Sequence, residues 1–584
     1  MVNYIERALK HVLWIVLAAC VRSVPPSAPP PPAPTPTAPA VKVAPPPLPL
    51  APVAPTGPDV EALLAQMSLS QKVGQLMMVG FAGTAVDEDI EALVKDRQVG
   101  GVCMFKRNIV NAAQIARLND EVRALLADSV PPFIAVDQEG GNVVRIADGN
   151  VVLPGNMALG ATRSAQLAYQ AGKAQGEDLR RLGFNMNLAP VLDVNLNPKN
   201  PVIGIRSFGD EVELVARFGA DFVRGQQDAN MVTVAKHFPG HGSTEADSHK
   251  ALPVMKETES EMLLQMEPFR VAVEAGLDGL MTAHVAMPKV TGDDLPATLS
   301  RQVLTHLLRQ RLGFGGLVLT DELEMEAIAN RYGVGRAAVM AIQAGADMVL
   351  IPWRPEKKTE VYLALLEAAR SGALSAQRLD ETVRRILTVK VKRGLFEPPP
   401  PLAERLARLG SDGKVAEQIA QAAVTLLRWD GRVLPLRASQ KIVVATAEGA
   451  LARAISARAP LAQALVVPAY ASSAERARAR QRTRELAASA DVVVVGVINS
   501  RQLELVTLAA STGKPVVAVT MGLPYLGEQV SEAQAVLATY SYREVSAAAA
   551  AAALFGEIGT PGKLPVRLSR YPFGHGVELA GPTP

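Results

Sequence analysis

The feature that most constrains the fold of this chain is a series of eight short apolar runs separated by stretches with helical periodicity. The runs span residues 75–80, 100–105, 132–137, 184–190, 231–236, 278–284, 316–321 and 345–351. Continuous apolar runs are typical of parallel strands that helices cover. Eight β/α repeats between Asp59 and Phe396 predict a closed (β/α)8 barrel of the TIM type, with an open doubly wound sheet as the alternative.

Polar side chains recur where these apolar runs end. Asp137, Asn187, Lys236, His284 and Asp321 all fall at or near the carboxyl end of a run. A parallel barrel brings the carboxyl ends of its strands to one rim, where the active sites of such barrels lie. The sequence therefore predicts a pocket at this rim.

A second, smaller domain follows the predicted barrel domain of residues 59–396. Residues 398–401 are four prolines, which break any helix and indicate a stiff linker over residues 397–413. Beyond it, strand-like runs alternate with helical stretches and predict an α/β sandwich domain over residues 414–584. These runs span residues 441–445, 464–468, 491–497 and 515–520.

The first twenty residues have the pattern of an export signal. Arg7 and Lys10 precede the apolar run 12–19, which is too short to span a bilayer, and Cys20 follows at once. The string Leu17-Ala18-Ala19-Cys20 resembles the lipobox of bacterial lipoproteins, in which the cysteine becomes the new N-terminus and carries the acyl chains. A buried first helix with an incidental cysteine is the alternative.

Residues 21–58 are predicted to form an extended tether. Residues 25–58 hold sixteen of the 43 prolines, and such a stretch stays close to polyproline II. With Cys20 lipidated, these features predict an exported lipoprotein anchored to a membrane and facing the periplasm or the cell exterior.

The charge and cysteine counts exclude other classes of protein. With 60 Lys and Arg against 57 Asp and Glu, the net charge of +3 gives no basic face for a nucleic acid. Cys103 is the only cysteine besides Cys20, so no intramolecular disulfide framework is expected.

Three of the seven histidines fall within the thirteen residues from His237 to His249. His237 and His241 have the i, i+4 spacing of a zinc site, but Pro239 between them prevents a continuous helix, so no metal is expected here. Asp247 and His249 form a different pair, because a carboxylate that accepts from one imidazole nitrogen raises the basicity of the other. This pair predicts a general acid/base with its orienting carboxylate; a loop histidine held structurally is the alternative.

Asp321 is the best-placed carboxylate for a nucleophile, because it closes the apolar run 316–321. Glu322, Glu324 and Glu326 are weaker candidates beyond the strand end. The remaining polar groups near the rim are of the kind that a polyol requires as hydrogen-bond partners, although each arginine alone could form a surface ion pair. The predicted binding residues are Asp137, Arg145, Arg206, Lys236 and His237.

Taken together, these motifs resemble family 3 of the glycoside hydrolases, and specifically its β-N-acetylglucosaminidase branch. The discriminating string is Lys236 to Gly242 followed, after four residues, by Asp247-Ser248-His249. Further matches in the barrel are residues 137–141 with Arg145, residues 205–209 and residues 320–325. Residues 513–517, 522–525 and 554–566 are similar to the C-terminal sandwich domain of the family.

The resemblance implies a retaining exo-β-N-acetylglucosaminidase without a cofactor. In this interpretation Asp321 forms a covalent glycosyl-enzyme intermediate, and His249 is the acid/base paired with Asp247. Asp137, Arg145, Arg206, Lys236 and His237 bind the sugar, and Asn185 and Asn187 are further candidates. The exported location indicates peptidoglycan fragments or chitooligosaccharides as substrates.

Three other functions stay open at this point. One is a β-glucosidase or β-xylosidase of the same family. Another is an N-acetylglucosaminide phosphorylase, because a neutral histidine acid/base repels phosphate less than a carboxylate does. The third is a non-catalytic wall-binding lipoprotein, which is disfavoured because only 4% of the residues are aromatic.

Overall fold

The computed structural model of the protein describes residues 57–126, 129–248 and 251–581. Cys20, the predicted signal sequence and nearly all of the predicted tether lie outside these residues, and so does His249. In the part of the chain that is described, no helix combines the length and the apolar composition needed to cross a bilayer.

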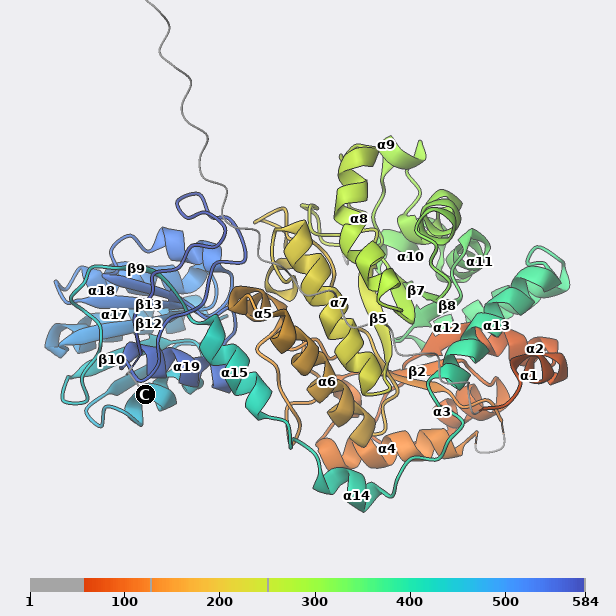
Figure 1. Ribbon diagram of the computed structural model, residues 1–584, viewed down its shortest axis with the longest axis horizontal. Coiled ribbons are helices and arrows are strands. Elements are labelled where there is room, and N and C mark those ends of the chain that lie inside the picture. Colours follow the sequence, from red (N-terminus) through yellow and green to blue (C-terminus); the bar gives the residue numbers. More distant parts are fainter. Residues whose placement is uncertain (1–56, 127–128, 249–250, 582–584) are drawn as a thin grey trace, which may run out of the picture. The chain divides into compact units, whose positions relative to one another are not determined.

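Eight parallel strands form a closed barrel, which confirms the predicted architecture (Figure 1). Strand β1 pairs with both β2 and β8, and Met78 lies opposite Gly101 on one side and Leu350 on the other, so the sheet is not open. Each strand falls within one of the eight apolar runs or overlaps it. The strands are β1 (Met77–Val79), β2 (Gly101–Met104), β3 (Phe133–Val136), β4 (Met186–Asn187), β5 (Val232–Phe238), β6 (Gly279–Thr282), β7 (Leu317–Glu322) and β8 (Met348–Ile351).

Helices surround this barrel, as Figure 1 shows for α4, α6, α7 and α8. Asn111, Ser164 and Thr258 cap α4, α6 and α8 with side-chain oxygens that accept from free backbone amides of the first turn. The helices of the outer layer are α4 (Ala112–Ala124), α6 (Ala165–Arg181), α7 (Val212–Asp228), α8 (Glu259–Glu274), the π-helix η5 (Gln302–Arg311), α11 (Val334–Ala344), α12 (Pro355–Arg370) and α13 (Ala376–Lys392). Shorter helices lie before and between them: α1 (Val60–Gln66), α2 (Leu69–Gln75), α3 (Glu88–Glu91), α5 (Asn156–Thr162), α9 (Pro288–Thr291) and α10 (Glu326–Tyr332).

The barrel interior is filled by apolar side chains. Met78, Phe133, Met186 and Met281 belong to one buried cluster, which makes the barrel a packed core and not a pore. Cys103 is part of this cluster as a free thiol, and burial raises its pKa to about 12.

The second sheet has six strands in the order β11-β10-β12-β13-β14-β9. Four of them lie at the predicted runs: β10 (Ile442–Thr446), β11 (Gln463–Val466), β12 (Val492–Val497) and β13 (Val516–Thr520). Two were not predicted, β9 (Thr425–Trp429) and β14 (Ala535–Ala538), which pair antiparallel at the edge. Arg428 interrupts the apolar pattern of β9, and the alanines of β14 have low strand propensity, so neither gave a strand signal.

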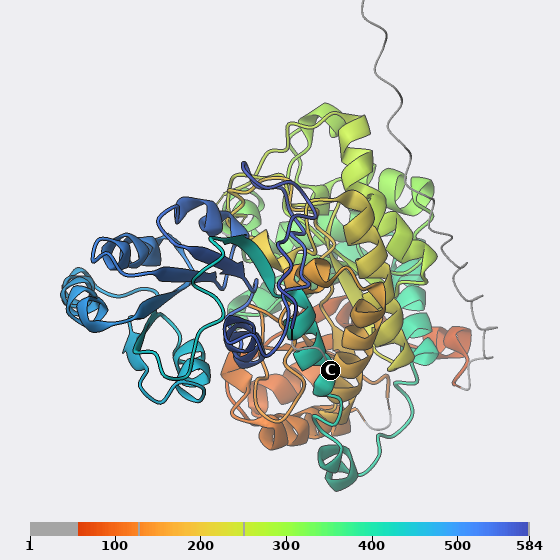
Figure 2. The same ribbon diagram turned by 60° about the vertical axis from the view of Figure 1, so that its left-hand side comes forward.

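Helices cover both faces of this sheet, as Figure 2 shows for the blue part of the chain. On one face, Val493 and Val495 of β12 pack with residues of α17 (Ser473–Ser489) and α18 (Leu503–Ala510). On the other face, Val492 and Val494 pack with α16 (Gly449–Ser456) and α19 (Glu544–Leu554). The predicted α/β sandwich is therefore present.

Two helices connect the barrel to the second sheet. Helix α14 (Leu402–Ala407) lies inside the predicted linker, and α15 (Lys414–Ala423) leads directly into β9. Buried Val415, Ala416 and Ile419 of α15 join the same apolar cluster as Met157 and Leu159 of α5, so the connection is packed against the barrel.

Candidate active site

The polar residues predicted at one rim do lie at the carboxyl ends of the barrel strands. Asp137 directly follows β3, and Asn187 closes β4. Lys236 lies near the end of β5, His284 follows β6, and Asp321 lies near the end of β7. Since the strands are parallel and the barrel is closed, these ends share one rim.

A chain of buried and partly buried ion pairs runs along one side of this rim. Asp137 accepts from Arg145 Nη2 at 2.8 Å and is also bonded to Lys236 Nζ. Lys236 Nζ reaches Glu139 Oε1 at 2.7 Å, and the guanidinium of Arg206 binds the same carboxylate through two nitrogens at 2.7 and 2.9 Å. The cluster joins three cations to two carboxylates and keeps a net charge of +1.

The electrostatics keep these groups charged although they are buried. Burial raises the pKa of Glu139, but the Arg206 and Lys236 charges outweigh it and hold that pKa well below its usual range. For Lys236, burial lowers the pKa, and the Asp137 and Glu139 charges reverse the effect and raise it. The cluster therefore presents fixed charge and hydrogen-bonding capacity at the rim.

Asp321 is an ionised carboxylate near this cluster. Its Oδ1 accepts from the backbone amide of Glu322 at 2.8 Å. Burial raises its pKa, but the nearby charges of His284, His237 and Lys236, together with that amide, bring the pKa below its ordinary value. An ionised carboxylate held among cationic groups is suited to nucleophilic attack.

Asp193 orients His237 through a hydrogen bond to its ring. Its Oδ2 lies 2.7 Å from His237 Nδ1, and its Oδ1 accepts from the backbone amide of His241 at 2.7 Å. Burial raises the pKa of Asp193, but the His237 charge and hydrogen bond lower it overall, so the carboxylate stays ionised. An ionised Asp193 requires Nδ1 of His237 to be the donor, which leaves Nε2 as the nitrogen available on the other edge of the ring.

His241 holds the loop that follows β5. Its Nδ1 lies 2.8 Å from Thr244 Oγ1 and its Nε2 lies 3.1 Å from Ser248 Oγ. Burial lowers its pKa to about 4, so the ring is neutral near pH 7. Both ring nitrogens are engaged within the loop, which makes His241 a structural residue.

His284 joins the ends of β6 and β7. Its Nδ1 lies 2.8 Å from Thr298 Oγ1, and its Nε2 lies 2.9 Å from the carbonyl oxygen of Glu322. Through Glu322, His284 fixes the backbone that follows Asp321.

The glutamates after Asp321 occupy other positions. The Glu324 carboxylate accepts from the backbone amides of Trp353 and Arg354 at 2.8 and 3.1 Å, and so anchors the loop after β8. Glu326 is exposed in α10.

Asp247 lies partly buried in the loop after β5, and its carbonyl accepts from the Ala251 amide at 3.1 Å. His249 is outside the described residues, so the pairing of Asp247 with His249 stays a prediction. The same holds for lipidation of Cys20.

The side chains of Asn185 and Asn187 form hydrogen bonds to the backbone of the barrel. The Asn185 side chain accepts from Ile134 N at 2.8 Å and donates to Pro132 O at 3.2 Å. Asn187 binds both the amide and the carbonyl of Gln138, at 3.1 and 3.0 Å. Both side chains are buried and hold neighbouring strands together, so the expectation that they bind sugar finds no support in their contacts.

The second domain contacts two loops of this rim. Asn195, two residues after Asp193, donates to Tyr525 Oη at 2.8 Å. Arg543 Nε donates to the carbonyl of Gly141 at 2.6 Å, on the loop between Asp137 and Arg145.

Sequence reasoning missed two charged members of the site. Glu139 lies within the motif of residues 137–141, and its pairs with Lys236 and Arg206 depend on contacts that the motif alone does not reveal. Asp193 follows the apolar run 184–190 by three residues, and the rule used for the other strand ends could have found it.

Comparison with known proteins gives a consistent result. The family model of the Glycosyl hydrolase family 3 N terminal domain matches residues 68–389, and that of the Glycosyl hydrolase family 3 C-terminal domain matches residues 424–573. The chain is 33% identical over 431 residues to beta-hexosaminidase A of Pseudoalteromonas piscicida, which covers 66% of this chain and 72% of that protein. It is 31% identical over 390 residues to a beta-N-acetylglucosaminidase/beta-glucosidase of Cellulomonas fimi, with 65% and 67% covered.

Solved structures agree with the sequence matches. A glycoside hydrolase family 3 beta-N-acetylglucosaminidase from Paenibacillus sp. str. FPU-7 matches with a TM-score of 0.81 and 37% identity. The match covers 86% of this chain and 99% of that protein, and so includes both the barrel and the second sheet.

Proposed function

The chain belongs to glycosyl hydrolase family 3, as its motifs predict, and on this basis we propose that it is a retaining exo-β-N-acetylhexosaminidase. Its substrates are terminal β-linked N-acetylglucosamine residues. The observation that carries the proposal is the ionised Asp321 at the end of β7, close to the charges of Lys236 and His237.

Asp321 is the nucleophile in this mechanism. One of its carboxylate oxygens forms a bond to the anomeric carbon while the glycosidic C–O bond breaks, and the electron pair of that bond leaves with the aglycone oxygen. The low pKa of Asp321 supports this role, because a protonated carboxyl group could not attack. Water then displaces Asp321, so two inversions retain the configuration at the anomeric carbon.

His249 is the proposed acid/base. It donates a proton to the leaving oxygen in the first step and takes a proton from water in the second. Its motif and its position two residues after Asp247 support the assignment. The loop that carries Asp247 begins at the end of β5, beside Lys236 and His237, which lie at the same rim as Asp321.

The ion-pair cluster is the proposed sugar-binding surface. Its three cations and two carboxylates supply donors and acceptors of the kind that vicinal hydroxyls require. The buried Nε of Arg145 has no hydrogen-bond partner within the described chain, which is consistent with a donor reserved for a substrate oxygen. In this interpretation Asp137, Arg145, Arg206, Lys236 and His237 contact the sugar, and Glu139 and Asp193 position them.

The proposed location is the cell envelope. The signal pattern, the lipobox at Cys20 and the proline-rich segment support an exported lipoprotein on a tether. Its substrates there are peptidoglycan fragments or chitooligosaccharides.

The deciding experiment follows aryl β-N-acetylglucosaminide hydrolysis by the parent chain and by Asp321→Asn and His249→Ala. We expect Asp321→Asn to lose on the order of 10⁴-fold in kcat or more. His249→Ala should lose about 10²- to 10⁴-fold on a poor leaving group and much less on an activated aryl group, which needs no proton. The exposed Glu326→Gln is the matched control and should keep parental activity.

Three readouts separate the alternatives. Retention predicts that the β-anomer of the sugar is formed first, as seen by proton NMR. Faster turnover of the aryl glucoside than of the N-acetylglucosaminide would make the protein a β-glucosidase, an activity that the name of the Cellulomonas fimi relative includes. A sugar 1-phosphate formed in phosphate buffer would show phosphorolysis, and an inert parent on all substrates would overturn the proposal.

A further inference from the structure

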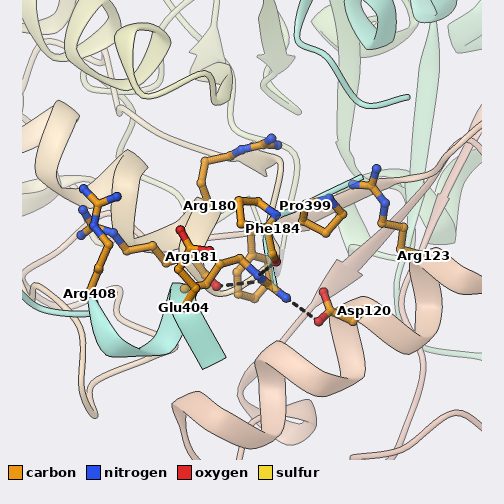
Figure 3. Close-up of a pocket in the computed structure, with 11 residues that line it drawn as sticks. Asp120, Arg123, Arg180, Arg181, Phe184, Pro399, Glu404 and Arg408 are labelled. Atoms are coloured by element: carbon orange, nitrogen blue, oxygen red, sulfur yellow. Dashed lines mark hydrogen bonds and ion pairs between the residues drawn. The ribbon is translucent and has the colours of Figure 1, made fainter. Parts of the chain in front are cut away.

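A cavity of about 150 Å³ lies at the opposite end of the barrel from Asp321, and Figure 3 shows the residues that line it. Phe184, in its wall, precedes β4, whereas the residues of the candidate active site follow the strands or end them. The other lining residues come from α4, the end of α6, the linker and α14: Asp120, Arg123, Arg180, Arg181, Gly183, Pro399, Pro400, Glu404, Arg405 and Arg408.

Five of these lining residues are arginines, against two carboxylates. Arg405 pairs with Asp120, and it also donates to the Arg181 and Pro400 carbonyls at 2.9 Å each. Arg181 pairs with carboxylates behind the cavity wall, among them Asp178 at 2.7 Å. These two guanidinium groups are thus neutralised by the protein itself.

Arg123 and Arg180 are not neutralised in this way. Arg123 donates from Nη2 to the backbone carbonyls of Leu395 and Glu397, which carry no charge. Burial lowers the pKa of Arg123 and the Asp120 charge opposes this effect, but the Asp120 carboxylate is already paired with Arg405. Arg180 has no hydrogen bond or ion pair from its guanidinium anywhere in the described ranges of the chain. Figure 3 shows these two side chains on either side of Phe184 and Pro399.

The surroundings of Arg180 disfavour its charged form. Burial lowers its pKa, the Arg123 and Arg405 charges lower it further, Glu397 opposes them, and the result is a pKa of about 10. Taking a cation out of water costs free energy unless a partner of opposite charge replaces the water. Two guanidinium groups at one cavity form strong, charge-assisted bonds to a phosphate group, which offers several acceptor oxygens and up to two negative charges.

We propose that this cavity is a binding site for a phosphate group, held between Arg180 and Arg123. The apolar surface of Phe184, Pro399 and Pro400 gives room beside the phosphate for a small substituent. Because Pro399 and Pro400 belong to the segment between the barrel and the second domain, the bound anion fastens this segment to the base of the barrel. The site is independent of the proposed hydrolase function, since it shares no residue with the rim.

Binding of inorganic phosphate to the full chain tests this inference. Calorimetry and thermal unfolding are measured at constant ionic strength, with sodium chloride replacing phosphate. We expect saturable binding and a rise of the melting temperature in the parent, and at least a tenfold loss of affinity in Arg180→Gln. Arg478→Gln, on the exposed face of α17, is the matched control and should bind like the parent.

The melting temperature measured without phosphate distinguishes an anion-binding role of Arg180 from a purely structural one. If Arg180 binds an anion and has no charged partner without it, Arg180→Gln should melt at the same temperature as the phosphate-free parent or higher, because an unpaired charge is removed. If Arg180 is structural, the variant should melt lower, and phosphate should stabilise both proteins equally; this result would overturn the proposal. Should Arg180→Gln fail to fold, Arg123→Gln gives the same comparison.

Two further measurements identify the kind of phosphate ligand and test whether the phosphate binds at the rim instead. Tighter binding of phenyl phosphate than of inorganic phosphate indicates an organic phosphate ligand, and equal binding indicates free phosphate. Aryl N-acetylglucosaminide hydrolysis should be unchanged in Arg180→Gln. Phosphate binding that survives in Arg180→Gln and Arg123→Gln would place the anion elsewhere and contradict the proposal.

Discussion

At the scale of single residues, the buried charges of the rim lie close to charges of the opposite sign. Glu139 lies between Lys236 and Arg206, and Asp193 lies against His237. His241, in contrast, is neutral. It is buried beside this cluster, and its ring nitrogens are hydrogen-bonded to two hydroxyls. Its titration therefore gives a direct measure of how strongly the folded rim resists protonation.

We predict that His241 makes the folded state sensitive to mild acid. Its folded pKa is about 4, against an ordinary value of 6.5. Above pH 6.5 the ring is neutral in both states and contributes nothing. As the pH falls from 6.5 to 4, only the unfolded chain takes up the proton, so stability falls by up to about 3 kcal/mol at about 1.4 kcal/mol per unit of pKa.

The measurement is urea unfolding at pH 7 and pH 5 for the parent and for His241→Gln, which cannot titrate. Between these two values the parent should lose roughly 2 kcal/mol more than the variant. An equal loss in both proteins would show that His241 is not the group responsible.

The residues of the site were predictable where they ended an apolar run. Asp137, Lys236 and Asp321 were found in this way, because a parallel barrel gathers strand ends at one rim. The partners of these residues were harder to find, since the link from Lys236 to Glu139 depends on how β5 and the loop after β3 approach each other in space. A sequence pattern carries no such distance.

At the scale of elements, the loops after β4 and β5 touch through their backbones. A Cβ added at Gly242 would lie 1.8 Å from the carbonyl oxygen of Val194 and 3.3 Å from the amide nitrogen of Asn195. This approach also brings the His241 amide to Asp193. Glycine at this position is therefore needed for the geometry of the candidate site.

We predict that Gly242→Ala lowers both stability and kcat/KM, because one loop must move and the hydrogen bond from His241 to Asp193 is disturbed. A backbone shift of this kind costs at least about 1 to 3 kcal/mol. Gly315→Ala, before β7, is the control, since a Cβ added there would meet no atom within 4 Å. Thermal unfolding and steady-state kinetics of the two variants check the prediction, and parental behaviour of Gly242→Ala would contradict it.

The elements of the barrel were more predictable than those of the second sheet. All eight barrel strands lie within or overlap continuous apolar runs that are separated by helices, so each run could be recognised. In the second sheet, β9 is an edge strand that pairs only with β14, a strand far along the chain, and β14 lies between β9 and β13. Short segments of this kind carry little signal of their own.

At the scale of the whole molecule, the second domain supports the rim through two hydrogen bonds. Tyr525 accepts from Asn195, and Arg543 donates to Gly141. Both barrel residues lie on loops that carry residues of the candidate site. The second domain is thus in a position to hold these loops, although it supplies no member of the ion-pair cluster.

We predict that Tyr525→Phe reduces kcat/KM by about 2- to 10-fold, which is the effect of losing one hydrogen bond worth about 0.5 to 1.5 kcal/mol. Arg453→Gln is the control in the same domain, because its ion pair with Glu544 is exposed. Steady-state kinetics with the aryl substrate, with circular dichroism to verify folding, give the comparison. Unchanged kinetics in Tyr525→Phe would limit the second domain to a role in stability.

The proposed lipid anchor is tested on the whole molecule. We predict that cells expressing the full chain incorporate labelled palmitate into it and that Cys20→Ser abolishes the label and releases the protein from the membrane fraction. The anchor depends only on the N-terminal signal, so hydrolysis by the released protein should match that of the parent. An unlabelled parent that retains Cys20 would contradict the prediction.

The pairing order of the two sheets has a consequence for the order of synthesis. In the barrel, β1 pairs with β8, and in the second sheet the first strand of the chain, β9, pairs with the last, β14. A chain that emerges from its N-terminus therefore leaves the edge of β1 unpaired until Ile351 is made, and the edge of β9 unpaired until Ala538 is made. Unpaired edges attract other strands, and such long-range pairing forms slowly. The barrel thus closes, and the second sheet is completed, only when the final strand of each has been made. Synthesis that stops early leaves a product with unpaired strands, which is exposed to aggregation and proteolysis.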